Sequence, residues 1–275
     1  MVLISVITLG GLGLLFGLLL ALAGKKFAVK VDPREEKILN LLPGSNCGAC
    51  GFAGCRGMAE ALIRGEAEVI SCPVVSEEVV YKIGEILGKK VEVREAKVAR
   101  VMCQGDDSKV KYDYSGVEDC RAAYLVADGY KACSYACLGF GTCKDVCPFD
   151  AIRWEKGKTP EILMDKCTAC GKCIEVCPTK VISLIPKKAK VYVKCNSFDK
   201  GAIVRKICKL GCIACGICVK VCEPGAIKLE NNLAIIDYEK CTNCGICVEK
   251  CPTNSIVFAQ IESVPTRTML SLRTK

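Results

Sequence analysis

A stretch near the middle of the chain has a cysteine spacing suited to iron–sulfur chemistry. Cys167–Pro178 reads CTACGKCIEVCP, so its spacing is C-x2-C-x2-C-x3-C-P. In this pattern the first three cysteines hold one [4Fe–4S] cluster, and the fourth ligates a second cluster. Similar runs occupy Cys212–Pro224 and Cys241–Pro252. Three such runs favour iron–sulfur binding over a chance match or a zinc site.

Cysteine dominates the composition, with 24 cysteines and no histidine among 275 residues. In a short secreted protein this content would indicate disulfides, but C-x2-C pairs are typical of loops that ligate one metal centre. The lack of histidine excludes Cys2His2 zinc modules. The formal net charge of +9 indicates no nucleic-acid partner, because five clusters with their thiolates would add roughly −10.

The N-terminal residues are expected to anchor the chain in a membrane. Residues 2–23 are uncharged and mostly apolar, and about 20 such residues cross a bilayer as one helix. The alternative is a cleaved signal peptide, because ALA at 21–23 resembles a cleavage site. The length of the run and the lack of a preceding Lys or Arg favour the anchor. Three lysines then predict that the remainder lies in the cytoplasm: Lys25, Lys26 and Lys30.

A second cysteine pattern, C-x2-C-x4-C-x16-C, follows the anchor. It comprises Cys47, Cys50, Cys55 and Cys72. Four thiols at this spacing could hold structural zinc, but the glycines between them allow the backbone to close around a larger group, and we expect a [4Fe–4S] cluster. Helices are predicted on both sides, one from Asp32 to near Pro43 and one from Ser76 to Gly88.

From Val98 onward the chain contains an internal repeat. The strand-like runs VARVMC and KVYVKC end in Cys103 and Cys195. A series spaced C-x3-C-x5-C-x3-C then begins at Cys133 in the first copy and at Cys208 in the second. Each series is followed by a predicted hairpin and a regular CP-terminated run. We therefore expect two bacterial-type ferredoxin domains, each a small pseudo-symmetric α+β unit with two clusters.

The two copies differ at one ligand position. Phe140 stands where the second copy has Cys215, so Cys133 is predicted to be the replacement ligand. With the fourth cysteine of each run serving the other cluster, the sequence predicts four ligand sets. They are Cys133, Cys137, Cys143 and Cys177; Cys147, Cys167, Cys170 and Cys173; Cys212, Cys215, Cys218 and Cys251; and Cys222, Cys241, Cys244 and Cys247.

Four cysteines remain outside these sets: Cys103, Cys120, Cys195 and Cys208. One interpretation is that they are buried free cysteines, which behave as small hydrophobic residues. The alternative is that the repeat brings them together around a sixth cluster. Five clusters are therefore expected and six are possible.

These segments predict a membrane anchor over 1–25, a four-cysteine module over 26–95, and ferredoxin-type domains over 96–188 and 189–275. No G-x-G-x-x-G lies between a predicted strand and helix, so no Rossmann site is visible. We therefore expect electron transfer, with no catalytic residues for substrate-bond chemistry on this chain.

The chain contains, in this order, the anchor, the CGACGFAGC site with its distant fourth cysteine, and the paired ferredoxin runs. In this arrangement it resembles the family of B subunits of the Rnf complex over essentially its whole length. The resemblance implies an electron-transfer subunit of an ion-translocating ferredoxin:NAD+ oxidoreductase in the inner (cytoplasmic) membrane. The implied partners are reduced ferredoxin and the membrane and flavin- or NAD-handling subunits. The doubled ferredoxin domain and Phe140 depart from shorter relatives.

Other functions fit parts of the same pattern. The chain could be the iron–sulfur subunit of another membrane-bound reductase or hydrogenase. From a different class, it could be a cluster-based redox sensor or a zinc-stabilised membrane adaptor. A sensor is expected to carry an effector- or DNA-binding element, and none is visible in the sequence.

Overall fold

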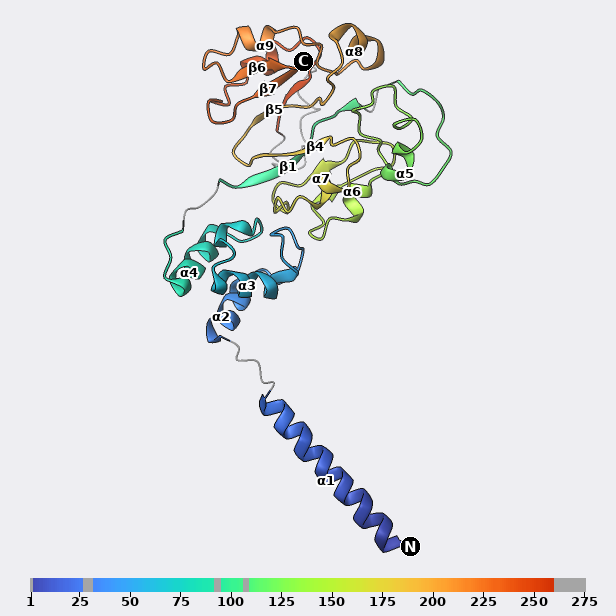
Figure 1. Ribbon diagram of the computed structural model, residues 1–275. Coiled ribbons are helices and arrows are strands. Elements are labelled where there is room, and N and C mark those ends of the chain that lie inside the picture. Colours follow the sequence, from blue (N-terminus) through green and yellow to red (C-terminus); the bar gives the residue numbers. More distant parts are fainter. Residues whose placement is uncertain (1, 27–31, 92–94, 106–108, 260–275) are drawn as a thin grey trace, which may run out of the picture.

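The computed structural model describes residues 2–26, 32–91, 95–105 and 109–259. Figure 1 shows a long N-terminal helix that stands apart from the remainder, then a small helical module, then two units built from short strands and helices. Helices and short antiparallel strand pairs make up these units, so the fold is α+β, as the sequence predicts.

Helix α1 (Val2–Lys26) is apolar around its whole circumference. Its large apolar side chains from Ile4 to Leu22 are exposed. Among the described residues one helix, Ile4–Lys26, is long and apolar enough to cross a membrane. An apolar surface of this extent needs lipid or protein to cover it. Lys25 and Lys26 form its last turn, whereas Lys30 lies outside the described residues.

The N-terminal module is a small helical body, and both predicted helices are confirmed. Asp32 caps the first of them by accepting a 2.9 Å hydrogen bond from the backbone N–H of Arg34. Gly88 ends the last with a left-handed φ of +65°. Ile38, Met58 and Ile83 form the apolar centre. The elements are α2 (Pro33–Leu41), α3 (Gly54–Arg64), the 3-10 helix η1 (Val69–Ser71) and α4 (Glu77–Leu87).

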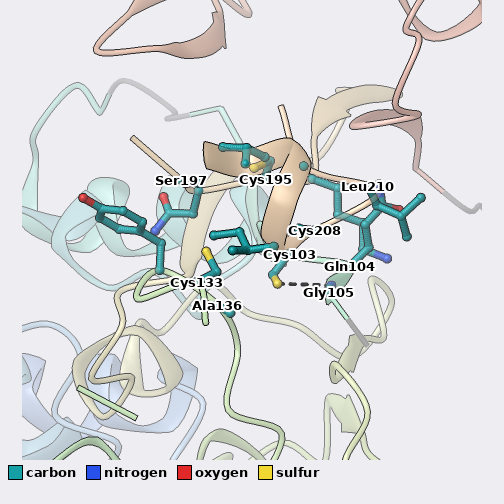
Figure 2. A pocket seen from close by; sticks show the side chains of 15 residues that line it. Cys103, Gln104, Gly105, Cys133, Ala136, Cys195, Ser197, Cys208 and Leu210 are labelled. Atoms are coloured by element: carbon teal, nitrogen blue, oxygen red, sulfur yellow. Dashed lines mark hydrogen bonds between the residues drawn. The ribbon is translucent and has the colours of Figure 1, made fainter. Parts of the chain in front are cut away.

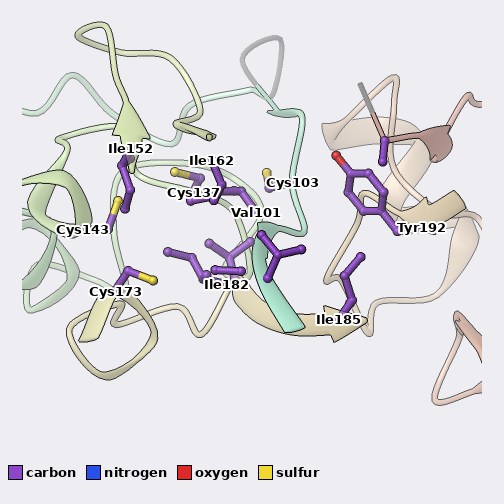
Figure 3. Packing of buried hydrophobic residues seen from close by; sticks show 14 of the residues in the cluster. Val101, Cys103, Cys137, Cys143, Ile152, Ile162, Cys173, Ile182, Ile185 and Tyr192 are labelled. Carbon is purple, nitrogen blue, oxygen red and sulfur yellow. The ribbon is translucent and has the colours of Figure 1, made fainter. Parts of the chain in front are cut away.

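The first strand–helix unit begins and ends with paired strands. Strand β1 (Lys97–Val101) runs antiparallel to β4 (Ile182–Pro186), with Lys97 opposite Pro186, and a short hairpin lies between them. Figure 3 shows that Cys137, Cys143 and Cys173 point into the apolar interior beside these strands. The intervening elements are α5 (Cys120–Tyr124), α6 (Thr142–Asp145), β2 (Ile152–Arg153), β3 (Glu161–Ile162) and α7 (Lys172–Glu175).

The second unit repeats this plan. Its first and last strands pair antiparallel, with Val191 opposite Phe258. Asn231 and Asn232 have φ of +49° and +65°, and two left-handed residues of this kind form the tight turn of the predicted hairpin. The elements are β5 (Val191–Val193), α8 (Gly201–Ile207), α9 (Ile217–Lys220), β6 (Ile227–Glu230), β7 (Leu233–Ile236), α10 (Ile246–Glu249) and β8 (Ile256–Phe258).

The two units share an apolar core. Tyr192 on β5 is buried in the same cluster as Val98 and Ile185 of the first unit (Figure 3). The guanidinium of Arg100 lies 5.4 Å from the centre of the Tyr192 ring, within the range of a cation–π contact. The units are therefore packed against each other, and cysteines at their contact can face one another.

Candidate iron–sulfur centres

All four cysteines of the N-terminal module line one cavity of about 260 Å³: Cys47, Cys50, Cys55 and Cys72. The turn that enters α3 shapes this cavity. The backbone N–H of Cys55 donates a 2.8 Å hydrogen bond to Oδ1 of Asn46. Gly54 has a φ of +85°, and a Cβ on it would come within 2.7 Å of the same oxygen. The turn therefore requires glycine, and it directs Cys55 towards the other thiols.

Four short helices each carry a buried cysteine at their second residue. Helices α6, α7, α9 and α10 all follow a glycine with left-handed backbone conformation, which other residues rarely adopt. At Gly141, before α6, a Cβ would lie 2.6 Å from the Trp154 ring. The repeated glycine turn points each of these cysteines inward: Cys143, Cys173, Cys218 and Cys247.

Two cavities are lined by complete predicted sets. One of about 340 Å³ is lined by Cys147, Cys167, Cys170 and Cys173. One of about 310 Å³ is lined by Cys212, Cys215, Cys218 and Cys251. In each set one cysteine comes from the other run of the same unit, as expected for a ferredoxin with exchanged fourth ligands.

The remaining set of the second unit gathers around Cys247. Burial, together with the neighbouring charges of Cys241, Cys244 and Cys222, raises the pKa of the Cys247 thiol to about 11. Charge effects of this kind require neighbouring groups. The structure therefore brings this predicted set together as well.

The structure groups Cys120, rather than Cys133, with the remaining cysteines of the first unit. A cavity of about 390 Å³ is lined by Cys120, Cys137, Cys143 and Cys177. Burial, together with the charge of Cys120, raises the pKa of Cys143 to about 12. The predicted grouping of Cys133 with this set is therefore corrected.

The physical reason lies in segment 109–132, part of a stretch of 29 residues between Cys103 and Cys133, whereas only 12 residues separate Cys195 from Cys208 in the second copy. Its two ends meet through a β-bridge between Val110 and Lys131. Phe140, which stands in the place of the missing cysteine, lies with its ring centre 5.4 Å from that of Tyr114 and 5.7 Å from that of Tyr130. Phe140 thus packs against the inserted segment, which brings Cys120 to the same cavity.

Cys133 instead lines a cavity of about 400 Å³ between the units, together with Cys103, Cys195 and Cys208 (Figure 2). The predicted grouping of Cys120 with these three is corrected in the same way. The repeat contained the signal that would have found this set. Cys133 precedes Cys137 by the same interval that separates Cys208 from Cys212, so Cys133 and Cys208 are equivalent positions.

The cavities fit a multi-atom group better than a single ion. No set of three or more cysteine, aspartate or glutamate side chains converges closely enough to hold one metal ion within the ranges that the structure describes. Four thiols spread around such a space match the ligand geometry of a [4Fe–4S] cluster.

Polar groups that line these cavities also favour a bound cluster. The hydroxyls of Ser45 and Thr168 are buried without a hydrogen-bond partner, and each residue lines a cysteine-bordered cavity. A buried hydroxyl without a partner is costly, and thiolate or cluster sulfur would be an acceptor for it. Backbone N–H groups also donate to ligand-position sulfurs, from Ala99 to Cys167 and from Ala151 to Cys147, each at 3.4 Å.

Two known families match the cysteine-rich parts of the chain. The family FeS, described as "Putative Fe-S cluster", matches residues 42–74. The family Fer4_7, described as "4Fe-4S dicluster domain", matches residues 131–181 and again 211–258. The two matches of the second family correspond to the two copies of the repeat, so the predicted tandem ferredoxin-type units are confirmed.

Curated relatives cover nearly the whole chain. The B subunit of the Na(+)-translocating ferredoxin:NAD(+) oxidoreductase complex of Acetobacterium woodii is 46% identical over 93% of this chain and 77% of its own length. The B subunit of the ion-translocating oxidoreductase complex of Methanosarcina acetivorans is 43% identical over 92% of this chain and 96% of its own length. Both matches therefore extend well beyond the ferredoxin-type units.

A third relative is the B subunit of the proton-translocating ferredoxin:NAD(+) oxidoreductase complex of Clostridium ljungdahlii, which is 42% identical over 84% of this chain and 82% of its own length. Identity at this level over most of both chains shows a common family. With the apolar helix α1, these relatives indicate a membrane-anchored protein that holds [4Fe–4S] clusters. The chain belongs to the family of B subunits of ion-translocating oxidoreductase (Rnf) complexes.

Proposed function

We propose that this chain is the electron-transfer subunit of an ion-translocating ferredoxin:NAD+ oxidoreductase and that it accepts electrons from reduced ferredoxin. Family membership supports the complex, since two of the relatives carry that activity in their names. The single observation that carries the electron-transfer role is the row of cavities, each lined by four cysteines, that runs through the N-terminal module and both units.

Five [4Fe–4S] clusters are assigned to these sites. When bound, such clusters take up and release single electrons. The proposed ligand sets are Cys47, Cys50, Cys55 and Cys72; Cys120, Cys137, Cys143 and Cys177; Cys147, Cys167, Cys170 and Cys173; Cys212, Cys215, Cys218 and Cys251; and Cys222, Cys241, Cys244 and Cys247. The domain limits go with this proposal: anchor 1–25, N-terminal module 26–95, and ferredoxin-type domains 96–188 and 189–275.

The protein's own residues hold and tune these sites. Burial of the cysteines excludes water, and N–H groups directed at sulfur stabilise negative charge there. At the second unit, both the backbone N–H and the hydroxyl of Ser255 lie 3.3 Å from Sγ of Cys251. Site-to-site differences in such contacts are the means by which one chain can set different reduction potentials.

Neighbouring sets also lie close to one another. Burial raises the pKa of Cys170, and a charge on Cys47 of the N-terminal module raises it further. Within the first unit, the charge of Cys173 contributes in the same way to the raised pKa of Cys143. Electrostatic coupling between the sets supports a relay along the chain, from the distal units towards the module beside the membrane.

The clusters are assigned to the cytoplasmic face of the membrane. Lys25 and Lys26 end α1, and positive residues flanking a membrane helix favour the cytoplasmic side. Reduced thiols persist in that compartment, as the assembly of clusters requires. The remaining partners are the membrane and flavin- or NAD-handling subunits of the same complex.

The test uses the full chain, purified anaerobically in detergent and mixed with reduced ferredoxin. We expect a brown protein whose visible absorbance bleaches on mixing and whose reduced form gives EPR signals of [4Fe–4S]+ clusters. Oxidised ferredoxin is the matched control and should cause no bleaching. A colourless, zinc-containing protein would contradict the cofactor class, and a brown protein that dithionite reduces but ferredoxin does not would contradict the proposed donor.

A further inference from the structure

The cavity between the two units is lined by four cysteines that the five proposed sites do not use (Figure 2). Cys103 and Cys133 come from the first unit, and Cys195 and Cys208 come from the second. Cys103 is buried and the others are half-buried. The volume of this cavity, about 400 Å³, is comparable with the volumes of the cavities assigned to clusters above.

The repeat accounts for this arrangement. Cys103 follows the end of β1 by the same interval at which Cys195 follows the end of β5. Cys133 and Cys208 likewise occupy equivalent positions before the first ligand of their unit. Each unit therefore contributes the same pair of thiols, and packing of the units brings the two pairs face to face.

Contacts across the boundary hold the two pairs in place. The rings of Tyr135 and Phe198, two and three residues beyond Cys133 and Cys195, meet edge to face with their centres 5.3 Å apart. The backbone N–H of Lys109 donates a 2.9 Å hydrogen bond to the carbonyl of Ile207, the residue before Cys208. These contacts fix the loops that carry three of the four thiols without any bond between the thiols themselves.

The surroundings favour negative charge on sulfur. The backbone N–H of Gly105 donates to Sγ of Cys103 at 3.3 Å. The side chain of Lys131 is buried, with 4% of its surface exposed, and its Nζ donates to the carbonyl of Gly105 at 3.0 Å. A buried ammonium is costly unless negative charge lies nearby. Four thiolates around a cluster would supply such charge.

Two simpler interpretations account for less. A zinc ion needs ligands that converge on one point, and the described side chains around this cavity do not converge in that way. Free buried cysteines behave as small hydrophobic residues that pack closely, whereas these four line one cavity together and three of them are only half-buried.

We infer that Cys103, Cys133, Cys195 and Cys208 hold a sixth [4Fe–4S] cluster, which is shared by the two ferredoxin-type units. Each thiol releases its proton to solvent as its sulfur bonds one iron, so four protons leave as a preformed cluster with a core charge of about +2 is bound. No oxidation or reduction accompanies this step. The inference rests on the proposed function only in taking [4Fe–4S] clusters as the cofactor class.

The position of the site suggests a role as the link between the units. Ala136 lines this cavity and directly precedes Cys137, a proposed ligand of the first unit. Gly211 also lines the cavity, and it directly precedes Cys212, a proposed ligand of the second unit. The interfacial site therefore adjoins the backbone of a proposed ligand in each unit.

Iron analysis of the full chain, purified anaerobically in detergent, tests the sixth cluster. With four irons in each cluster, we expect about 24 irons per wild-type chain and about 20 in the Cys103→Ala/Cys195→Ala variant. Ser197→Ala is the matched control, because Ser197 lines the same cavity without being a proposed ligand. It should retain the wild-type iron content.

A second pair of variants tests which cysteines share the site. Cys133→Ala/Cys208→Ala removes two ligands of one proposed cluster and should lower the iron by about four, whereas Cys120→Ala/Cys208→Ala affects two clusters and should lower it by about eight. The reverse pattern would return Cys133 to the set of Cys137 and overturn the assignment.

The iron content of the wild-type chain does not depend on whether a substituted chain folds. A wild-type content of about 20 irons, unchanged in Cys103→Ala/Cys195→Ala, would remove the sixth cluster while leaving the proposed function intact. A wild-type chain that contains zinc and no iron would instead contradict the proposed function itself. Integration of the EPR signal after dithionite reduction gives an independent count of the reducible clusters.

Discussion

The backbone N–H of Cys120 donates a 2.8 Å hydrogen bond to Oγ1 of Thr142. That hydroxyl lies 3.2 Å from Oδ2 of Asp119, to which it donates in turn. Asp119 also caps α5 by accepting from the backbone N–H of Arg121 at 2.8 Å. Hydrogen bonds on both sides therefore tie the inserted segment to α6, the helix that carries Cys143, and this tie brings Cys120 to the first unit's cysteine set.

Thr142→Val tests the importance of this tie. Valine keeps the shape of the side chain but leaves the Cys120 amide without its acceptor, and a buried donor without a partner costs about 1–3 kcal/mol. We expect about four irons to be lost to a chelator ahead of the remainder, measured as a time course under anaerobic conditions. Thr142→Ser keeps the hydroxyl and should release iron at the wild-type rate. Equal release by the valine variant and the wild type would show that the tie is dispensable.

The hydroxyl of Ser255 should tune the potential of one cluster. Burial acts to raise the pKa of Cys251, but hydrogen bonds from the Ser255 hydroxyl and from nearby backbone N–H groups outweigh it and lower that pKa. Such bonds stabilise the more negative, reduced state of a cluster and raise its potential. Ser255→Ala should therefore shift one potential to a more negative value, measured by an EPR-monitored redox titration.

The matched control for that shift is Thr253→Val. The Thr253 hydroxyl lies 3.8 Å from the same sulfur, compared with 3.3 Å for Ser255, so its removal should produce a smaller shift. A shift of equal size in both variants, or a positive shift in Ser255→Ala, would show that the Ser255 hydroxyl does not stabilise the reduced cluster.

The spacing of cysteines predicted the ligand runs, which are encoded within a few residues of sequence. It missed the ligand positions that depend on packing between distant segments. Glycine turns before Cys143 and Cys218 are encoded within a few residues, so the regular runs and the α+β repeat could be predicted. The position of Cys120 depends on how the inserted segment folds over Phe140, through ring contacts that sequence spacing cannot show. Cys133 was different, because its equivalence to Cys208 was visible in the repeat.

Removal of α1 should separate the anchor from the iron–sulfur chemistry. The side chains of α1 from Ile4 onward make no buried contact with the described remainder of the chain, apart from the half-buried Ala23. We therefore expect a variant lacking residues 2–26 to be water-soluble, to keep the wild-type iron content and to accept electrons from reduced ferredoxin. Ultracentrifugation, iron analysis and bleaching measure these three properties.

The full-length chain prepared in detergent is the control for this deletion. The truncated variant should also fail to join the membrane complex, since about 20 apolar residues provide the attachment. Loss of iron or of reduction by ferredoxin in the soluble variant would show that α1 does more than anchor the protein.

The N-terminal module should be the last site before the partner subunits. It follows α1 directly in the chain, and Cys47 lies near Cys170 of the first unit, since its charge contributes to the raised pKa of that thiol. Cys50→Ala should lower the iron content by about four and leave the other clusters reducible by ferredoxin, yet stop NAD+ reduction by the assembled complex. Ser71→Ala is the matched control, because Ser71 directly precedes Cys72 but does not line the cavity, and it should sustain NAD+ reduction. Undiminished NAD+ reduction by Cys50→Ala would place the module outside the electron path, and failure of ferredoxin to reduce the other clusters would place it at the start of the path rather than at its end.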